Sequence, residues 1–174
     1  MLVFGSSFSA HKCSAVGTFK ILATTDEAVW QQYLGLVPEK ELVHYPAYTR
    51  AFEKYGDGIG ECFVYEEDGI VLYPYLRRKI EGSDKFTDII TPYGYGGAVH
   101  MQDGGQAPGL FQRFRRAFVD YLRATDTVSE FVRFHPLLAN HKYFWTLMDE
   151  GSGSVRCFVH ELCFSSSFML FLKK

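Results

Sequence analysis

Two pairs of side chains in this sequence are of the types that bind charged or aromatic ligands. Tyr93 and Tyr95 stand in a glycine-rich run after one apolar segment, and Arg133 and His135 lie at the end of another. Arginine binds phosphate or carboxylate with a planar fork of donors, and histidine can act as a base near neutral pH. Because Arg133 and His135 are two residues apart on a predicted strand, their side chains should share a face. We therefore predict a substrate site made of Tyr93, Tyr95, Arg133 and His135.

A structural role explains the same residues equally well. Arg133 would pair with an acid, and His135 would cap a strand end. The glycines of residues 93–97 suggest a phosphate-binding loop, because bare backbone amides bind anions. The run has neither G-x-G-x-x-G nor G-x-x-x-x-G-K-[ST], and about ten residues separate it from the next predicted helix. We interpret it as a turn that presents Tyr93 and Tyr95.

Other chemistries find less support. Two histidines and three cysteines could be assembled into a zinc site, but no C-x-x-C pair is present, and incidental thiols explain them better. They are His11, Cys13, Cys157, His160 and Cys163. The serines near the carboxyl end lack a G-x-S-x-G elbow. We predict no metal site and no serine nucleophile.

Basic residues are interspersed with acids, so we interpret them as solvated surface. Those that could contact the phosphates of a tRNA or of a nucleotide-linked lipid precursor are Arg77, Arg78, Lys79, Arg113, Arg115, Arg116 and Arg123. The formal net charge of −2 and the pI near 6.3 exclude a strong overall attraction to nucleic acid or to anionic membrane.

Composition indicates one folded unit. A chain of 174 residues, 47% hydrophobic and 17% aromatic, can bury a substantial core. Its four cysteines are too scattered for a disulfide scaffold, which favours reduced thiols in the cytoplasm. Residues 1–10 lack the basic segment of a signal peptide, and the longest apolar run, residues 168–172, is far too short to span a membrane.

The first part of the predicted fold contains two short helices. Thr24 and Glu27 have the spacing of a capping box at the start of the first helix, and Gly35 suits its end. Pro46 suits the first position of the second helix, which should stop at Gly56. The residues expected on the buried faces are Val29, Trp30, Tyr33 and Leu34, then Tyr48, Ala51, Phe52 and Tyr55.

The remaining elements alternate between strand and helix. Residues 61–76 predict a hairpin around Asp68-Gly69, in which Pro74 requires a sheet edge or a bulge. A strand over residues 87–91 leads to a helix over residues 108–124, and a strand over residues 129–134 follows. The helix should bury Phe111, Phe114, Phe118, Tyr121 and Leu122. This order of elements predicts an α+β fold with a mixed, mostly antiparallel sheet flanked by helices.

Four segments together resemble the FemAB-like branch of the GNAT acyltransferase superfamily. They are residues 44–49, 62–69, 88–97 and 131–138, and the likeness covers roughly residues 25–145. The resemblance implies transfer of an acyl or aminoacyl group to an amine, with acyl-CoA or aminoacyl-tRNA as donor. It also implies a small-molecule or cell-wall-precursor acceptor and contact with tRNA. Tyr93, Tyr95, Arg133 and His135 would then line the acceptor groove.

The resemblance also predicts how the chain is divided. It implies an extension over residues 1–24, a partial GNAT-like domain over residues 25–149 and an atypical tail over residues 150–174. Residues 93–97 lack the Q/R-x-x-G-x-G/A signature with which GNAT enzymes bind the pyrophosphate of acyl-CoA. We therefore expect the donor site in a missing carboxy-terminal part, an inactive fragment, and self-association through exposed sheet edges. The alternative is a non-catalytic domain that binds a peptide or glycan.

Overall fold

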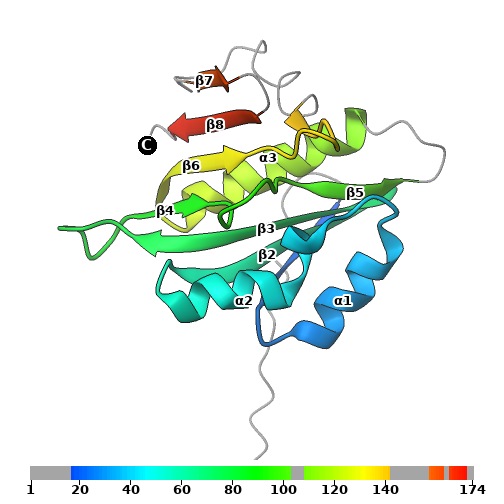
Figure 1. The fold of residues 1–174 in the computed structure, drawn as a ribbon, viewed down its shortest axis with the longest axis horizontal. Coiled ribbons are helices and arrows are strands. Elements are labelled where there is room, and N and C mark those ends of the chain that lie inside the picture. The colour runs from blue at the N-terminus through cyan, green and yellow to red at the C-terminus, as the bar shows by residue number, and fades with distance from the viewer. Residues whose placement is uncertain (1–16, 103–107, 142–156, 163–164, 172–174) are drawn as a thin grey trace, which may run out of the picture.

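The computed structural model describes residues 17–102, 108–141, 157–162 and 165–171 of the chain. They form a mixed sheet with helices on both faces, which confirms the predicted α+β class (Figure 1). The strands are β1 (Thr18–Ala23), β2 (Ile59–Glu66), β3 (Gly69–Lys79), β4 (Thr87–Ile90), β5 (Val99–Gln102), β6 (Thr127–Arg133), β7 (Cys157–Leu162) and β8 (Ser165–Phe171). The helices are α1 (Glu27–Leu36), η1 (Leu42–His44, a 3-10 turn), α2 (Pro46–Tyr55) and α3 (Pro108–Ala124).

The strands lie in the order β1-β2-β3-β4-β6-β8-β7, and β5 pairs with β3 beyond the end of β4. Of the ladders in the described part of the chain, only the one between β4 and β6 is parallel. The helix α3 connects this parallel pair through β5, because two parallel neighbours need a crossover. The sheet is therefore mostly antiparallel, as predicted, with one parallel seam near its middle.

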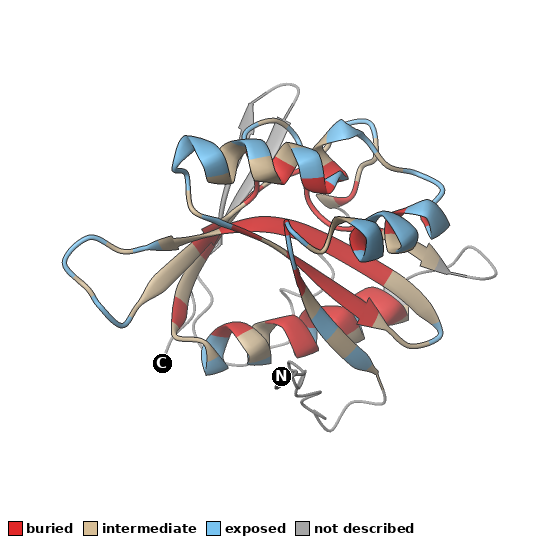
Figure 2. Ribbon diagram, turned by 90° about the horizontal axis from the view of Figure 1, so that it is seen from below, coloured by how far each residue is buried: buried red, intermediate tan, exposed pale blue. Residues whose placement is uncertain are grey.

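Two apolar clusters cover the two faces of the sheet. Phe63 and Tyr65 of β2 pack with α3, whereas the alternate residues Cys62 and Val64 pack with α1. Figure 2 shows the buried strands between α3 on one side and the α1 and α2 helices on the other. Burial on both faces explains why β2 and β3 read as continuous apolar runs rather than as alternating ones.

The predicted capping box at the start of α1 is wrong. The helix begins at Glu27 with Asp26 at its N-cap, and the Thr24 hydroxyl instead donates to the carboxylate of Glu53 in α2. Trp30 and Leu34 are buried as expected. Val29 is 42% exposed, so the apolar face is narrower than predicted, and α1 begins later than predicted and continues past Gly35 to Leu36.

The bounds of α2 are confirmed, but its buried face is different. The helix runs from Pro46 to Tyr55, and Gly56 follows in the left-handed conformation with φ of 100°. The buried residues are Pro46 and Thr49, while Tyr55 is 86% exposed. Tyr48 and Phe52 are only partly buried and Ala51 is exposed. The aromatic spacing therefore predicted the wrong face of this helix.

The hairpin of β2 and β3 is confirmed, and Pro74 lies where the prediction requires. On one side Pro74 faces Cys62 of β2. On the other side β5 pairs with residues 69–72 and β4 with residues 76–79, so residues 73–75 have no ladder partner there among the described residues. The missing N–H of proline is thus accommodated at a local gap in a strand that is otherwise central.

The helix over residues 108–124 is also confirmed. Its side chains Phe111, Phe114, Phe118 and Leu122 are buried against the sheet, and Tyr121 is partly buried. Full burial of one such side chain contributes about 2 kcal/mol to the stability of the folded state. The apolar stripe at helical spacing was therefore a reliable signal.

Four of the strands were not predicted from the sequence. β5 follows the glycine-rich run, β1 lies within the predicted extension, and β7 and β8 lie within the predicted tail, where β8 pairs with β6. The division of the chain into an extension, a domain and a tail stays a prediction.

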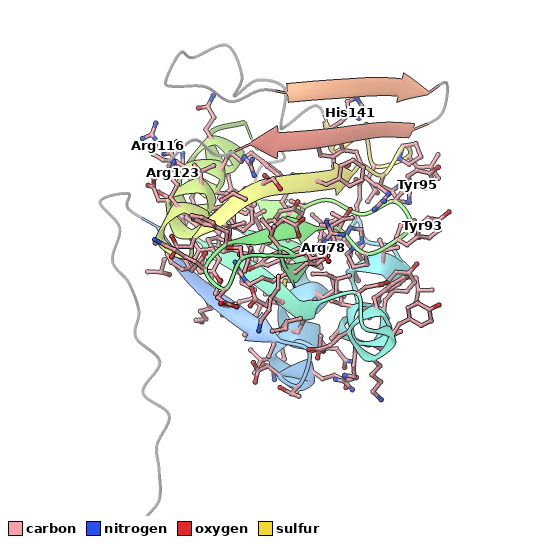
Figure 3. The ribbon with its side chains drawn as sticks, turned by 90° about the vertical axis from the view of Figure 1, so that its left-hand side faces the viewer. Arg78, Tyr93, Tyr95, Arg116, Arg123 and His141 are labelled. Carbon is pink, nitrogen blue, oxygen red and sulfur yellow. The ribbon has the colours of Figure 1, made fainter. Side chains whose placement is uncertain are left out.

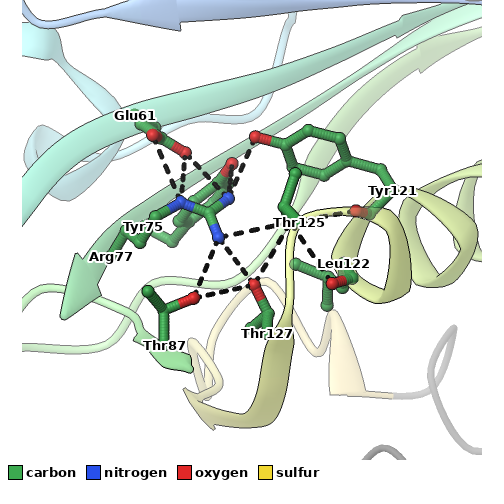
Figure 4. A network of polar contacts seen from close by, with 8 residues as sticks. All are labelled: Glu61, Tyr75, Arg77, Thr87, Tyr121, Leu122, Thr125 and Thr127. Atoms are coloured by element: carbon green, nitrogen blue, oxygen red, sulfur yellow. Dashed lines mark hydrogen bonds and ion pairs between the residues drawn. The ribbon is translucent and has the colours of Figure 1, made fainter. Parts of the chain in front are cut away.

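A network of polar contacts around Arg77 joins the end of the sheet to α3 (Figure 4). The guanidinium of Arg77 donates to Glu61 of β2, with an Nη2 to Oε2 distance of 3.1 Å. It also donates to the hydroxyls of Thr127 in β6 at 2.6 Å and of Tyr121 in α3 at 2.9 Å. The arginine therefore links elements that are far apart in the sequence.

In the described part of the chain, no helix has the length and apolar character needed to cross a membrane.

Candidate functional site

The glycine-rich loop interrupts what would otherwise be one long strand. Ile90 at the end of β4 is opposite Leu76 of β3, and Val99 at the start of β5 is opposite Leu72. The chain uses residues 91–98 to cover the length of residues 73–75, so the loop must leave the plane of the sheet. This excursion places Tyr93 and Tyr95 outside the core.

The loop is held between β6 and α2 by hydrogen bonds to its backbone. Gly96 N donates to Arg133 O at 2.8 Å, and His135 N donates to Gly96 O at 3.2 Å. The Tyr48 hydroxyl of α2 donates to Tyr93 O at 2.8 Å. Gly96 and Phe134 form the last parallel bridge between the two segments. The parallel seam therefore ends at this point.

Asn140 fixes the far side of the loop. Its side chain is buried and donates from Nδ2 to Gly96 O at 2.8 Å and to Ala98 O at 3.2 Å, while its Oδ1 accepts from His135 N. Gly97 has a φ of 91°, and a Cβ there would lie 2.7 Å from Asn140 Nδ2. Only glycine allows this approach.

A cleft of about 580 Å³ opens beside the loop, on the side where α2 ends. Its lining combines the turn after α2, the ends of β3 and β4, the loop and the end of β6. The lining residues are Gly56, Asp57, Gly58, Leu76, Arg78, Lys79, Ile90, Thr91, Tyr93 and Arg133.

Arg133 is the most unusual residue of this cleft. Its guanidinium carbon lies 4.6 Å from the centre of the Phe131 ring and 5.8 Å from that of Tyr93, which are cation–π distances. The guanidinium donates a hydrogen bond from Nη1 to the backbone oxygen of Thr91 at 3.5 Å. Among the described residues no carboxylate pairs with it. Burial, assisted by the nearby Arg78, lowers the pKa of Arg133 although the Tyr93 hydroxyl opposes this.

The other cations of the cleft differ in how they are neutralised. Arg78 forms a two-pronged pair with Asp88, with distances of 2.8 and 2.7 Å. Its hydrogen bond to Asp88 raises the pKa of Arg78 despite partial burial. Lys79 has no ion pair with any described residue. The cleft therefore contains two unpaired cations, Lys79 and Arg133, and one acid, Asp57.

The structure brings together only some of the predicted site residues. Tyr93 and Arg133 line the cleft, whereas Tyr95 and His135 do not. Tyr95 is 44% exposed and lies at the same edge of the molecule as Tyr93 (Figure 3). β6 ends at Arg133, so His135 lies past the strand, where alternation no longer sets its direction, and its Nδ1 accepts from Leu138 N at 3.3 Å. The four residues stay a prediction as a substrate site.

The sequence reading missed several residues of this region. Arg78, Lys79 and Asp57 reach the cleft only because the hairpin brings the end of β3 beside the turn after α2. Asn140 acts through backbone carbonyls more than forty residues away, as its contacts with Gly96 and Ala98 show. No local pattern indicates such a role.

One missed signal is visible in the sequence. β5 ends at Gln102 and α3 begins at Pro108, and the link reads Gln102-Asp-Gly-Gly-Gln-Ala107. This fits the Q-x-x-G-x-A pattern that residues 93–97 lack. This signal was not recognised because the sequence analysis predicts no strand before it. Residues 103–107 lie outside the described part of the structure.

The predicted zinc candidates lie mostly outside the described residues. His11, Cys13 and Cys163 are not described, and only the backbone is described for Cys157 and His160. Within the described ranges, no group of three His, Cys, Asp or Glu side chains is arranged to hold a metal ion.

No protein-family model matches the sequence, and no curated protein does either. The structure is similar to several solved structures. One is a Salmonella typhimurium protein named as an acetyltransferase and solved with acetyl-CoA, with 14% identity, a TM-score of 0.43, and coverage of 91% of this chain and 94% of that one. A GNAT-family protein from Desulfovibrio desulfuricans has 13% identity, a TM-score of 0.47 and coverage of 90% and 98%. The ribosomal-protein-S5-alanine acetyltransferase of Vibrio fischeri has 11% identity, a TM-score of 0.47 and coverage of 93% and 94%. Because these similarities are low, we base the function on this chain's own residues.

Proposed function

We propose that this protein is an N-acyltransferase of the GNAT type that transfers an acyl group from acyl-CoA to an amine. The observation that carries the proposal is the Q-x-x-G-x-A sequence of residues 102–107, which stands between a strand, β5, and the start of a long helix, α3. Backbone amides and the helix dipole at such a position favour a bound pyrophosphate. The glycines permit the phosphates to approach the backbone closely.

The edge of β5, beyond the end of the parallel seam, is also suited to hold the donor. β4 and β6 are neighbours up to the Gly96–Phe134 bridge, beyond which β5 pairs with β3 and has no second partner among the described residues. A strand edge of this kind offers free backbone groups to an extended ligand that contains amides. The pantetheine arm of CoA is such a ligand.

The acceptor would enter from the cleft lined by Tyr93 and Arg133. The amine nitrogen attacks the thioester carbonyl carbon, the C–S bond breaks and CoA leaves as the thiolate. The proton that the amine loses passes through a base or water to this thiolate, which gives the CoA thiol. The protein contributes mainly by holding both substrates in reacting orientation. Because the donor signature lies in this chain, we expect activity here and replace the expectation that the donor site is missing.

The finer assignments depend on the sequence resemblance alone. Residues 44–49, 62–69, 88–97 and 131–138 resemble the FemAB-like branch, for which cell-wall precursors are an acceptor class. A cell-wall-precursor amine as acceptor and a cytoplasmic site of action are therefore part of the proposal. The Q-x-x-G-x-A sequence favours acyl-CoA over aminoacyl-tRNA as the donor.

A thermal-shift titration with acetyl-CoA tests the donor site. A ligand that binds only the folded state raises the melting temperature, so we expect a dose-dependent rise for the natural sequence. Gly105→Ala should weaken acetyl-CoA binding by about tenfold or more, because a methyl group obstructs the approach of the phosphates. Gly35→Ala is the matched control, since a Cβ at Gly35 meets nothing within 4 Å.

Two outcomes would count against the proposal. If the natural protein melts cooperatively but acetyl-CoA leaves its melting temperature unchanged, the protein does not use this donor. If acetyl-CoA binds but no amine in a broad screen releases CoA thiol, the non-catalytic binding domain becomes the better description.

A further inference from the structure

We propose that the cleft beside Arg133 binds an anionic group of the acceptor, a carboxylate or a phosphate monoester, through Arg133 and Lys79. The inference deepens the proposed function and rests on it in naming the acceptor as the ligand. It assigns to the acceptor a chemical class that neither the fold nor the sequence resemblance specifies. We call the ten lining residues given above the Arg133 cleft.

No described carboxylate neutralises the charge of Arg133. Half-buried arginines are normally paired with a carboxylate, because removing a cation from water costs free energy. Arg133 lies over Phe131 and Tyr93 instead, and no described carboxylate pairs with it. Contact with the two rings holds the guanidinium in place, and its remaining N–H groups can bind a planar or tetrahedral oxyanion.

The charged side chains that line the cleft leave an excess of positive charge. Arg78 is neutralised by Asp88, and the charge of Asp57 also acts on Arg78. The cations of Lys79 and Arg133 thus have no described counterion. Arg78 and Arg133 are close enough for their charges to interact, which lowers the pKa of Arg133 in addition to the effect of burial. An anion bound here would relieve this repulsion.

Part of the remaining lining of the cleft is apolar. Leu76, Ile90 and the Tyr93 ring provide apolar surface beside the cations. A ligand pocket of this kind holds an apolar body and orients it by a few charged contacts. The cleft borders the loop at which the parallel seam ends, so an acceptor held by its anion would have its amine end free to reach the thioester.

Binding of small anions tests the site without any assumption about catalysis. We would titrate inorganic phosphate, and separately acetate, against sodium chloride at matched ionic strength and follow the melting temperature. We expect a specific rise with at least one of the two anions. Arg133→Gln should weaken that binding about tenfold, as expected for the loss of one charge-assisted contact. Phosphate alone would indicate a phosphate monoester, and acetate alone a carboxylate.

The control is Arg116→Gln. Arg116 is exposed on α3 and lies at the opposite end of the view in Figure 3 from Tyr93. This variant should retain anion binding in full. Arg133→Lys keeps the charge and should retain part of the affinity for the anion. Lys79→Gln should weaken anion binding independently, so the site can still be tested if Arg133→Gln folds poorly. The inference would be overturned if Arg133→Gln and Arg116→Gln weakened anion binding equally. It would also be overturned if neither anion raised the melting temperature of the natural protein.

Paired acceptors test the role of the site in transfer. Tyramine is compared with tyrosine, and glucosamine with glucosamine 6-phosphate, with acetyl-CoA as donor and thiol release as readout. The anionic member of at least one pair should have a kcat/KM about tenfold or more higher, through KM, and Arg133→Gln should abolish the preference. Equal kcat/KM values within both pairs would overturn the inference.

The two proposals fail in distinguishable ways. Loss of acetyl-CoA binding with retained phosphate or acetate binding would overturn the donor assignment while the anion site stands. Acetyl-CoA binding and turnover without selection for anionic amines would leave the acyltransferase assignment standing and remove the anion site.

Discussion

His44 is a buried histidine whose ring is only half satisfied. Its Nδ1 accepts from Glu41 N at 3.0 Å, and its Nε2 has no hydrogen-bond partner among the described residues. Burial lowers the pKa of His44 from 6.5 to about 4, and the nearby His135 adds to this effect. The neutral ring is therefore built into the folded state beside the loop that forms the cleft.

This histidine should make the protein less stable in mild acid. Its folded pKa lies below its unfolded pKa, so the unfolded state binds more protons between pH 4 and 6.5 and stability falls as the pH falls. The loss from His44 between pH 7 and pH 5 is about 2 kcal/mol. We expect His44→Asn, whose amide oxygen can replace Nδ1, to reduce the pH dependence of the unfolding free energy by this amount in urea titrations. An unchanged dependence would show that His44 is protonated in the folded protein.

At the scale of elements, the turn between α2 and β2 forms one wall of the Arg133 cleft. Gly56 has a φ of 100° with open space at its Cβ position. Gly58 has a φ of 136°, and a Cβ there would lie 2.7 Å from the carbonyl oxygen of Arg77. The turn therefore requires glycine at both positions: Gly56 for its backbone conformation alone, and Gly58 for its backbone conformation and for the lack of space.

Alanine substitutions should separate these two causes. Gly56→Ala should cost about 1 kcal/mol from the left-handed conformation alone, and Gly58→Ala about 2–3 kcal/mol because the backbone must also move. Chemical denaturation gives both values. Gly35→Ala in α1 has neither problem and should raise stability by up to about 1 kcal/mol. Equal costs at positions 56 and 58 would contradict the predicted clash with Arg77.

The network around Arg77 connects distant parts of the whole domain. Arg77 and Glu61 have side chains that are 12% and 17% exposed, and the hydroxyls around them come from β3, β4, β6, α3 and the turn before β6. A buried pair is costly to break because the remaining charge is left unmet. The network closes the end of the sheet away from β5.

Removing this arginine should destabilise the whole domain. Arg77→Met, which keeps much of the volume, should cost about 3 kcal/mol, because Glu61 loses its cation. A double-mutant cycle with Glu61→Gln should give a coupling of about 1–3 kcal/mol in equilibrium unfolding. Arg116→Met, on the exposed face of α3, should stay within about 0.5 kcal/mol of the natural protein. A coupling near zero would mean that the two side chains act independently.

The two edge strands of the sheet each have one partner among the described strands. Within the described ranges β1 pairs only with β2, and β7 only with β8. Self-association through a sheet edge stays a prediction.

Local chemistry by itself determined several elements. The spacing of Phe111, Phe114 and Phe118 was sufficient for α3, and Gly56 was sufficient for the end of α2, because each signal acts within a few residues of the chain. The Asp68-Gly69 turn between two runs of β-branched and aromatic residues predicted the hairpin for the same reason. Tyr93 and Arg133 could be selected as candidates because their side-chain types are suited to binding.

Only the tertiary structure decided which of these candidates meet. Arg133 and Tyr93 share a cleft with Arg78, Lys79 and Asp57 because β3, β4, β6 and the turn after α2 pack side by side there. His135 and Tyr95 do not line it, although the sequence grouped them with the other two. The unmet charge of Arg133 could not be predicted either, since whether a carboxylate lies near a cation depends on contacts between residues far apart in the chain. Ion pairs, burial and the electrostatic potential at a site arise only when distant segments pack together. Turns and helix faces, in contrast, are determined by neighbouring residues.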